Sequence, residues 1–330
     1  MRLRKPRLSG ATCAAACIAD THLFAPTSDS DALFPGWMKL LPPPEQEALY
    51  ARIAAEVRRA YEAGLAWLRE RDAAFVVHLG DVTGGWGREG MRHPDVRREA
   101  ARCEADLGSV GVPVRYCVGN HDLGVHQFGG SRDFSPALEA WQHVFGGVFW
   151  SRVAADMLAL GIASPVADYR GTAPHLLRLK REQEAFLADT LAQHRDKRWT
   201  LFLHNPLSVR NLLPVLTPHR RRLNAVVGGD LHRPGSGNLL RAFGRMPGAR
   251  WMTRTPGLLP FLRRTTVCPS TAPLWWRGYG ALELAMAPRR IRPRLVTLER
   301  PMESEPVPTA SLRWCWKGMH AVQPDAVGGM

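Results

Sequence analysis

Residues that can bind metal ions occur in five short polar motifs, each directly after an apolar segment. The motifs are Asp20-Thr21-His22, Gly80-Asp81, Gly119-Asn120-His121-Asp122, His204-Asn205-Pro206 and Gly229-Asp230-Leu231-His232. Carboxylate, imidazole and amide oxygen together are typical ligands of divalent ions such as Mn, Fe, Zn and Co. Two such ions about 3.5–4 Å apart can bind the attacking and leaving oxygens of a phosphoryl displacement and lower the pKa of a bound water. The motifs therefore indicate a dinuclear hydrolytic centre.

The apolar segments before the motifs have the length and composition of β-strands. They cover Cys13–Ala19, Ala73–Leu79, Val114–Val118, Trp199–Leu203 and Asn224–Val227. Apolar residues at helical spacing predict helices between them, over Glu45–Arg71, around Val96 to Leu107, and over Arg181–His194. Strands that alternate with helices favour a layered α/β fold. In such folds ligands bind beyond the carboxyl ends of the strands, where all five motifs lie.

The ordered set DxH, GD, GNHD, H and GxH resembles the calcineurin-like metallophosphoesterase superfamily over roughly Cys13–Glu299. The resemblance implies a four-layer α/β/β/α sandwich of two mixed sheets flanked by helices. It also implies a role for each matching residue. The residues of one metal site would be Asp20, His22 and His232, with Asp81 bridging to a second ion completed by Asn120 and His204. His121 would donate a proton to the leaving oxygen or stabilise the phosphoryl charge. Asp122 would orient His121.

One motif departs from the family pattern. The last motif is usually GHxH, and here Asp230 stands where a second-metal histidine is expected. Aspartate is also a metal ligand, and its charge favours harder ions, so we expect two divalent ions, Mn or Fe rather than Zn. A weak second site is the alternative, and at Asp230 itself a turn residue that binds no metal is another.

The predicted function is hydrolysis of a phosphodiester or phosphomonoester by a metal-bound hydroxide, without a phosphoenzyme. A catalytically weak or silent scaffold of the same fold is one alternative, which only Asp230 supports. A nuclease or nucleic-acid-binding protein is another, suggested by the net charge of +14. The arginines are spread along the chain, as a GC-rich coding bias would also produce, so a nucleic-acid partner is compatible with the sequence but not required by it. Beyond the phosphate-ester substrate no partner is predicted, and the oligomeric state stays open.

The 330 residues, 45% hydrophobic and 22% charged, are ordinary for a globular protein. We expect a catalytic domain over 1–300 and a tail outside the core over 301–330. No segment approaches the roughly 18 apolar residues of a membrane span. The N-terminus only superficially resembles a secretion signal, because cleavage there would remove the first strand, so a cytoplasmic location is expected. The six scattered cysteines indicate reduced, buried thiols.

Several segments are assigned from weaker patterns. Thr265–Ser270 and Tyr279–Glu299 are expected to form strands of the half of the sandwich that lacks the first strands. Phe24–Pro44, Val125–Tyr169 and Leu239–Arg264 are expected to be loops that shape the substrate site. Arginines from Arg241 to Arg264 could alternatively recruit a polyanion. His78 is interpreted as a core histidine with satisfied hydrogen bonds, and the run Arg220-Arg221-Arg222 as a solvated helix face.

Overall fold

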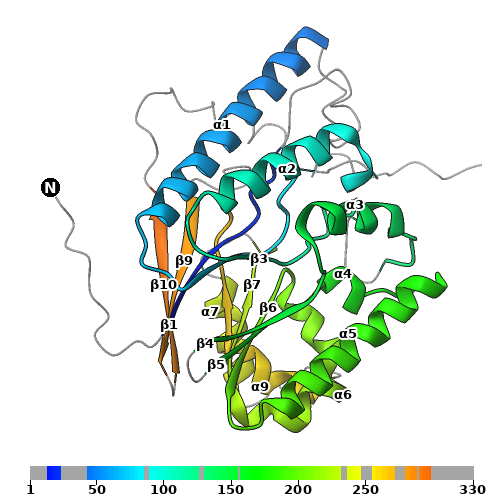
Figure 1. Cartoon of the computed structure of the whole chain (residues 1–330), viewed down its shortest axis with the longest axis vertical. Helices are drawn as coiled ribbons and strands as arrows, with labels where there is room; N and C mark the ends of the chain where they lie inside the picture. The colour runs from blue at the N-terminus through cyan, green and yellow to red at the C-terminus, as the bar shows by residue number, and fades with distance from the viewer. Residues whose placement is uncertain are drawn as a thin grey trace, which may run out of the picture. The chain divides into compact units, whose positions relative to one another are not determined.

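Two five-stranded mixed sheets form the centre of the protein (Figure 1). The computed structural model describes residues 13–23, 43–84, 89–125, 130–154, 157–231, 236–246, 255–271, 279–287 and 290–298. All of these belong to one unit, Met1–Glu299. The predicted tail 301–330 lies outside the described residues, so its separation from the core stays a prediction.

The first sheet has the order β10-β9-β1-β2-β3. Its strands are β1 (Cys13–Ile18), β2 (Phe75–His78), β3 (Val114–Tyr116), β9 (Tyr279–Ala287) and β10 (Arg290–Leu298). β1, β2 and β3 are parallel neighbours, and β9 is antiparallel to both β1 and β10. The carboxyl ends of β1, β2 and β3 therefore meet at one edge of this sheet.

The second sheet has the order β4-β5-β6-β7-β8. Its strands are β4 (Trp150–Ala154), β5 (Met157–Gly161), β6 (Arg198–Leu203), β7 (Leu223–Gly228) and β8 (Thr265–Val267). β5 to β8 are parallel, and β4 is antiparallel to β5. The carboxyl ends of β6, β7 and β8 consequently also lie at a common edge.

Alternation along the strands produces the layers. In β1, Ala15 and Cys17 face a core shared with Phe202 of the second sheet, whereas Ala16 and Ile18 face a separate core on the other side. That separate core contains buried residues of α1 (Pro43–Arg69), α2 (Pro94–Gly108) and α3 (Ser135–Phe145). A third core packs the second sheet against α5 (Pro174–Gln193), α6 (Leu213–Leu216) and α9 (Leu259–Leu262). The predicted four-layer sandwich is confirmed.

Two of the weaker assignments were wrong. The described residues of Val125–Tyr169 and Leu239–Arg264 are not mainly loops, because they contain regular elements: α3, β4, β5, α4 (Ser164–Ala167), most of α7 (Ser236–Arg245) and α9. β5 is buried along its whole length, so its apolar run shows no alternation to detect. Phe24–Pro44 lies outside the described residues except for its last two, which begin α1.

The last strands were assigned to the wrong sheet. β8 joins the second sheet as expected, but β9 and β10 extend the first sheet beyond β1. Cys17 pairs with Leu282 in this antiparallel ladder. Because β1 would otherwise be an edge strand with unpaired backbone groups, β9 completes its hydrogen bonding.

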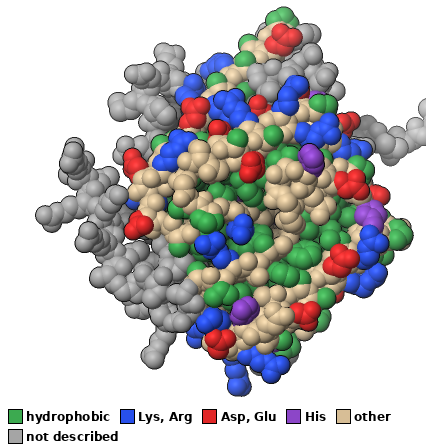
Figure 2. All heavy atoms as spheres, in the orientation of Figure 1, with side chains coloured by type: hydrophobic (Ala, Val, Ile, Leu, Met, Phe, Trp, Pro, Cys, Tyr) green, Lys and Arg blue, Asp and Glu red, His purple; other side chains and the backbone are tan. Residues whose placement is uncertain are grey.

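The surface and the cysteines bear on the remaining expectations. On the face seen in Figure 2, basic and acidic side chains are interspersed and do not gather in one area. Arg241, Arg263 and Arg264 donate hydrogen bonds to backbone carbonyls. The described cysteine side chains, Cys17, Cys103, Cys117 and Cys268, are buried free thiols. No helix in the described part of the chain has the length and apolarity to span a membrane.

Candidate metal centre

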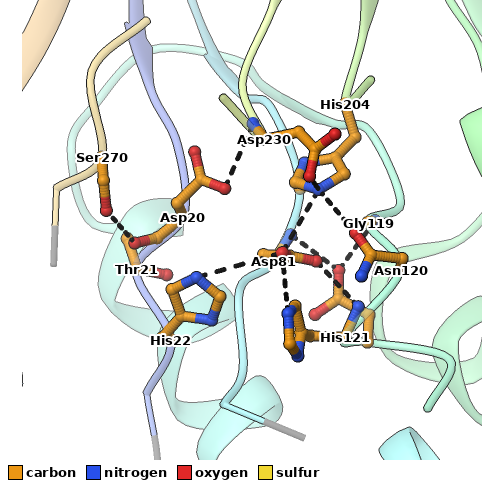
Figure 3. Close-up of polar contacts among 12 residues, drawn as sticks. Asp20, Thr21, His22, Asp81, Gly119, Asn120, His121, His204, Asp230 and Ser270 are labelled. Atoms are coloured by element: carbon orange, nitrogen blue, oxygen red, sulfur yellow. Dashed lines mark hydrogen bonds and ion pairs between the residues drawn. The ribbon is translucent and has the colours of Figure 1, made fainter. Parts of the chain in front are cut away.

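Eight of the nine predicted site residues come together where the two sheets present their strand ends. Figure 3 labels all of these except Asp122, whose carboxylate accepts a hydrogen bond from the backbone N–H of Asp81. Asp20 and His22 follow β1, Asp81 follows β2, and Asp230 follows β7. The residues that follow β3 and β6 complete the group: Asn120, His121, Asp122 and His204. His232, the ninth predicted residue, lies outside the described residues. Segments up to 210 residues apart in sequence thus converge on one place.

The Asp81 carboxylate occupies the middle of the group. Its Oδ2 lies 3.2 Å from His204 Nε2 and 3.9 Å from the Nε2 atoms of His22 and His121. Its Oδ1 accepts a hydrogen bond of 2.9 Å from the backbone N–H of His121. One carboxylate oxygen therefore faces three imidazole rings, as a bridging ligand between two ions would.

The hydrogen bonds of His204 define which ring nitrogen faces the centre. Nδ1 lies 2.9 Å from the carbonyl oxygen of Leu79, which can only accept, so Nδ1 carries the proton. Nε2 then lies 3.0 Å from Asn120 Oδ1 and 3.6 Å from Asp230 Oδ1, besides the contact with Asp81. In metal-binding histidines, one ring nitrogen binds the metal and the N–H of the other commonly donates to a backbone carbonyl.

Asn120 and Asp230 also turn oxygen atoms toward the centre. The amide nitrogen of Asn120 donates to the carbonyl of Val125 at 3.0 Å, which leaves the amide oxygen facing His204. The backbone N–H of Asp230 donates to Asp20 Oδ1 at 3.2 Å, so this turn is fixed against the end of β1. Ligand atoms of Asp20, Asp81 and His204, all buried, lie within 4.8 Å of one another. This donor set fits divalent cations.

The backbone at the centre is strained. Four non-glycine residues among those described have a positive φ: Asp20 (53°), His22 (46°), Asp81 (51°) and Asp230 (58°). All four are predicted ligands. Left-handed conformations of non-glycine residues cost about 1–3 kcal/mol each and persist where the surroundings over-determine them, typically at functional sites. Strain confined to the ligands is an observation independent of their side-chain chemistry.

At two positions neighbouring atoms lie so close to the backbone that only glycine fits. Gly80 has φ +98°, and a Cβ there would lie 2.8 Å from His204 Nδ1. A Cβ on Gly119 would lie only 2.1 Å from Asp81 Oδ1. The glycines beside the ligands therefore permit the two sheet edges and the Asp81 carboxylate to come together.

The pKa values show an excess of buried negative charge. Burial raises the pKa of Asp20 well above its ordinary value, and the nearby Asp81 and Asp230 add to this. Burial likewise raises the pKa of Asp230 to about 6. Burial alone would lower the pKa of His204, but the carboxylates of Asp81, Asp230 and Asp20 raise it well above its usual range. Cations bound among these carboxylates would supply the missing positive charge.

The carboxylate of Asp122 contacts the main chain around Asp81. Oδ2 accepts from the backbone N–H groups of Asp81 (3.0 Å) and Gly119 (2.9 Å), and Oδ1 accepts from the N–H of Thr83 (3.1 Å). Burial and the charge of Asp81 raise the pKa of Asp122 to about 7. Burial lowers the pKa of His121. These contacts give Asp122 a role in holding the Asp81 turn, and its predicted orientation of His121 stays a prediction.

Sequence reasoning missed residues that support the ligands. The hydroxyl of Ser270 donates to the carbonyl of Asp20 at 3.1 Å, and Thr271 N–H donates to the carbonyl of Ala19 at 2.8 Å. Both follow β8, so the rule that selected the other strand ends would have found them at this sixth end. His78, interpreted as a satisfied core histidine, is fully buried and hydrogen-bonded to Thr21 and Gly80.

Comparisons with known proteins give a family match and distant similarities to solved structures. A family model described as calcineurin-like phosphoesterase matches residues 15–234. Among solved structures, a dimetal phosphatase from Danio rerio is 14% identical over 88% of this chain and 100% of its own, with a TM-score of 0.48. A cold-active protein-tyrosine phosphatase of a psychrophile, Shewanella sp., is 10% identical over 87% and 80% of the two chains, with a TM-score of 0.31. No curated protein matches the sequence. The similarity to these two solved structures is too distant to support a conclusion about the present chain.

Proposed function

Because the chain belongs to the calcineurin-like phosphoesterase family, we propose that it hydrolyses a phosphate ester at a dinuclear metal centre bridged by Asp81. The observation that carries the proposal is the convergence of three imidazole rings on one buried carboxylate oxygen. Asp20, His22 and His232 would hold one ion, and the remaining ligands, Asn120, His204 and Asp230, the other. The part of His232 rests on its place in the sequence motif.

Two divalent ions bound there supply an activated water and positive charge for the phosphoryl oxygens. The residues of the chain do the rest. Asp81 and His204 hold their donor atoms in a buried, preorganised array, which costs no rearrangement during the reaction. His121 remains partly accessible, with 19% of its side chain exposed, and its Nε2 lies 3.9 Å from Asp81 Oδ2. We propose that its ring hydrogen-bonds the substrate phosphoryl group or protonates the leaving oxygen.

Asp230 bears on the metals and on the alternative of a silent scaffold. Its Oδ1 lies 3.6 Å from His204 Nε2 and its side chain is 18% exposed, so this oxygen is oriented toward the other ligands. This supports a full second site with an additional negative charge. A site of this charge favours Mn or Fe over Zn, since carboxylate oxygen suits harder ions than imidazole does.

The test is a metal titration of the purified, metal-free full chain. Turnover of bis(p-nitrophenyl) phosphate and of p-nitrophenyl phosphate is measured with Mn, Fe, Zn and Mg, which also separates diester from monoester preference. Mn-dependent turnover is expected, and Asp81→Asn should abolish it. Asp189→Asn, which removes an exposed carboxylate on α5, is the matched control and should retain turnover. Absence of metal-dependent turnover in the wild type, or full activity of Asp81→Asn, would refute the proposal.

A further inference from the structure

A buried polar pair outside the ligand set lies beneath the centre. Thr21 stands between the ligands Asp20 and His22, and His78 is the last residue of β2, three positions before Asp81 (Figure 3 labels Thr21). Thr21 is 1% exposed and His78 is 0% exposed. Thr21 Oγ1 and His78 Nε2 are 3.0 Å apart. A buried polar pair of this kind requires an explanation, because apolar residues of similar shape would be cheaper to bury.

The hydrogen bonds of the pair have defined directions. The backbone N–H of Gly80 donates to His78 Nδ1 at 3.2 Å, so Nδ1 is the acceptor and Nε2 carries the proton. Nε2–H therefore donates to Thr21 Oγ1, and the Thr21 hydroxyl donates in turn to the carbonyl of Val82 at 2.8 Å. Burial lowers the pKa of His78 to about 3, which keeps the ring neutral and this direction unchanged.

These contacts enclose the turn that carries the bridging ligand. The Thr21 hydroxyl is hydrogen-bonded to His78, two residues before the Gly80-Asp81 turn, and to Val82, the residue directly after it. The turn itself, Gly80-Asp81, also receives backbone hydrogen bonds from the β1 loop. Asp20 N–H donates to the carbonyl of Gly80, and His22 N–H donates to the carbonyl of Asp81, both at 3.0 Å.

The strained ligands need such support. Asp20, His22 and Asp81 all have positive φ, a conformation that relaxes unless neighbouring contacts hold it. Thr21 lies between Asp20 and His22 in the sequence. Its hydroxyl is hydrogen-bonded to residues on either side of Asp81.

We propose that Thr21 and His78 form a positioning relay that holds the Asp20, His22 and Asp81 ligands in their metal-binding geometry. Neither residue touches substrate or metal in this proposal, so both are positioning residues. The inference rests on the proposed dinuclear function. It predicts that breaking the relay weakens metal binding itself, beyond any loss of fold stability.

The experiment measures the dissociation constant of Mn²⁺ by isothermal titration calorimetry on the metal-free full chain. Thr21→Val keeps the shape of the side chain and removes the hydroxyl. Supporting contacts around metal ligands typically change affinity by about 10- to 100-fold, and we expect at least about tenfold weaker binding here. Thr21→Ser retains the hydroxyl, and this variant should bind Mn²⁺ with close to the wild-type affinity.

Thr200→Val is the matched control. Thr200 is also 0% exposed, lies in β6, and its hydroxyl has no hydrogen-bond partner among the described residues. Removing this hydroxyl should leave Mn²⁺ affinity unchanged. A further variant, His78→Leu, tests the pair as a unit. In the double variant with Thr21→Val, the loss of affinity should be clearly smaller than the product of the two single losses.

The outcomes separate the relay from the function on which it rests. Wild-type protein that binds no Mn²⁺ would refute the dinuclear centre, and the relay with it. Wild type that binds Mn²⁺, together with Thr21→Val that binds equally well, would refute the relay alone. Urea unfolding of each metal-free variant gives the stability separately. If Thr21→Val lowers only the unfolding midpoint and leaves the Mn²⁺ affinity intact, Thr21 is merely structural and the inference fails.

Discussion

Replacing Gly119 with alanine should displace the central carboxylate. The added Cβ would lie 2.1 Å from Asp81 Oδ1 and 2.3 Å from Asp81 N, whereas real Cβ contacts essentially never fall below 3.0 Å. The carboxylate or the loop must therefore move by about 0.9 Å, which is the 3.0 Å limit minus the 2.1 Å from the added Cβ to Asp81 Oδ1. Because Asp81 Oδ1 also accepts the His121 N–H, this movement disturbs both sides of the centre.

The size of the effect follows from that displacement. A misplacement of about 1 Å at a reacting centre can cost about 100-fold in rate. A 100-fold loss corresponds to about 2.7 kcal/mol of transition-state stabilisation at about 1.36 kcal/mol for each factor of ten. We expect kcat/KM for an aryl phosphate ester with Mn²⁺ to fall by at least this factor in Gly119→Ala. The overpacked site should also destabilise the fold by about 1–3 kcal/mol.

The control is a glycine-to-alanine change without the clash. Gly108 ends α2, and a Cβ there meets nothing within 4 Å. Gly108→Ala should leave kcat/KM unchanged and stabilise the chain slightly, by about 0.4–1 kcal/mol. Activity is measured at a temperature where circular dichroism shows both variants folded. If Gly119→Ala retains wild-type kcat/KM, the position of Asp81 does not matter for catalysis and the assigned centre is wrong.

Two further predictions concern stability. Arg222 was predicted to lie on a solvated face, yet its guanidinium donates to the carbonyls of Leu191 and His194 at the end of α5. Arg222→Ala should therefore lower the free energy of unfolding in urea by about 1–3 kcal/mol, whereas the exposed Arg221→Ala should change it by less than about 0.5 kcal/mol; equal effects would contradict the capping role. Burial raises the pKa of Asp168, so the folded chain keeps a proton there that the unfolded chain releases, and this group's contribution to stability falls as pH rises from the unfolded to the folded pKa. Asp168→Asn should lose less stability than wild type as the pH rises above about 4, the ordinary pKa of an aspartate, and an equal loss would show that the pKa of Asp168 is not raised.

The ligands could be predicted from the sequence because two constraints coincide on them. Asp81 and His204 belong to the few residue types that bind divalent ions, and each directly follows a buried apolar run. Parallel strands bring such positions to one edge. Residue type and position therefore reinforce each other without knowledge of the tertiary packing. His204 is predictable in this way although 123 residues separate it from Asp81.

Strand partners could not be predicted in the same way. The apolar run of β5 is compatible with a strand or a buried helix turn, and only burial on both faces distinguishes them. The run at β9 is recognisable as a strand, but nothing local selects Cys17 as the partner of Leu282 over a residue of the second sheet. That choice depends on which edge remains open after the other strands have paired.

The supporting contacts are the least predictable, and the reason is chemical. A metal accepts few side-chain types, so its ligands are conspicuous, whereas a backbone carbonyl or amide accepts almost any polar partner. Thr21 and His78, 57 residues apart, therefore look in the sequence like a turn residue and a core histidine. Their role depends on hydrogen-bond directions, and those directions follow only once Gly80 and Val82 are placed around them. The strained backbone at Asp20, His22 and Asp81 indicates where such support is needed, and backbone strain leaves no signature in residue type unless the residue is glycine.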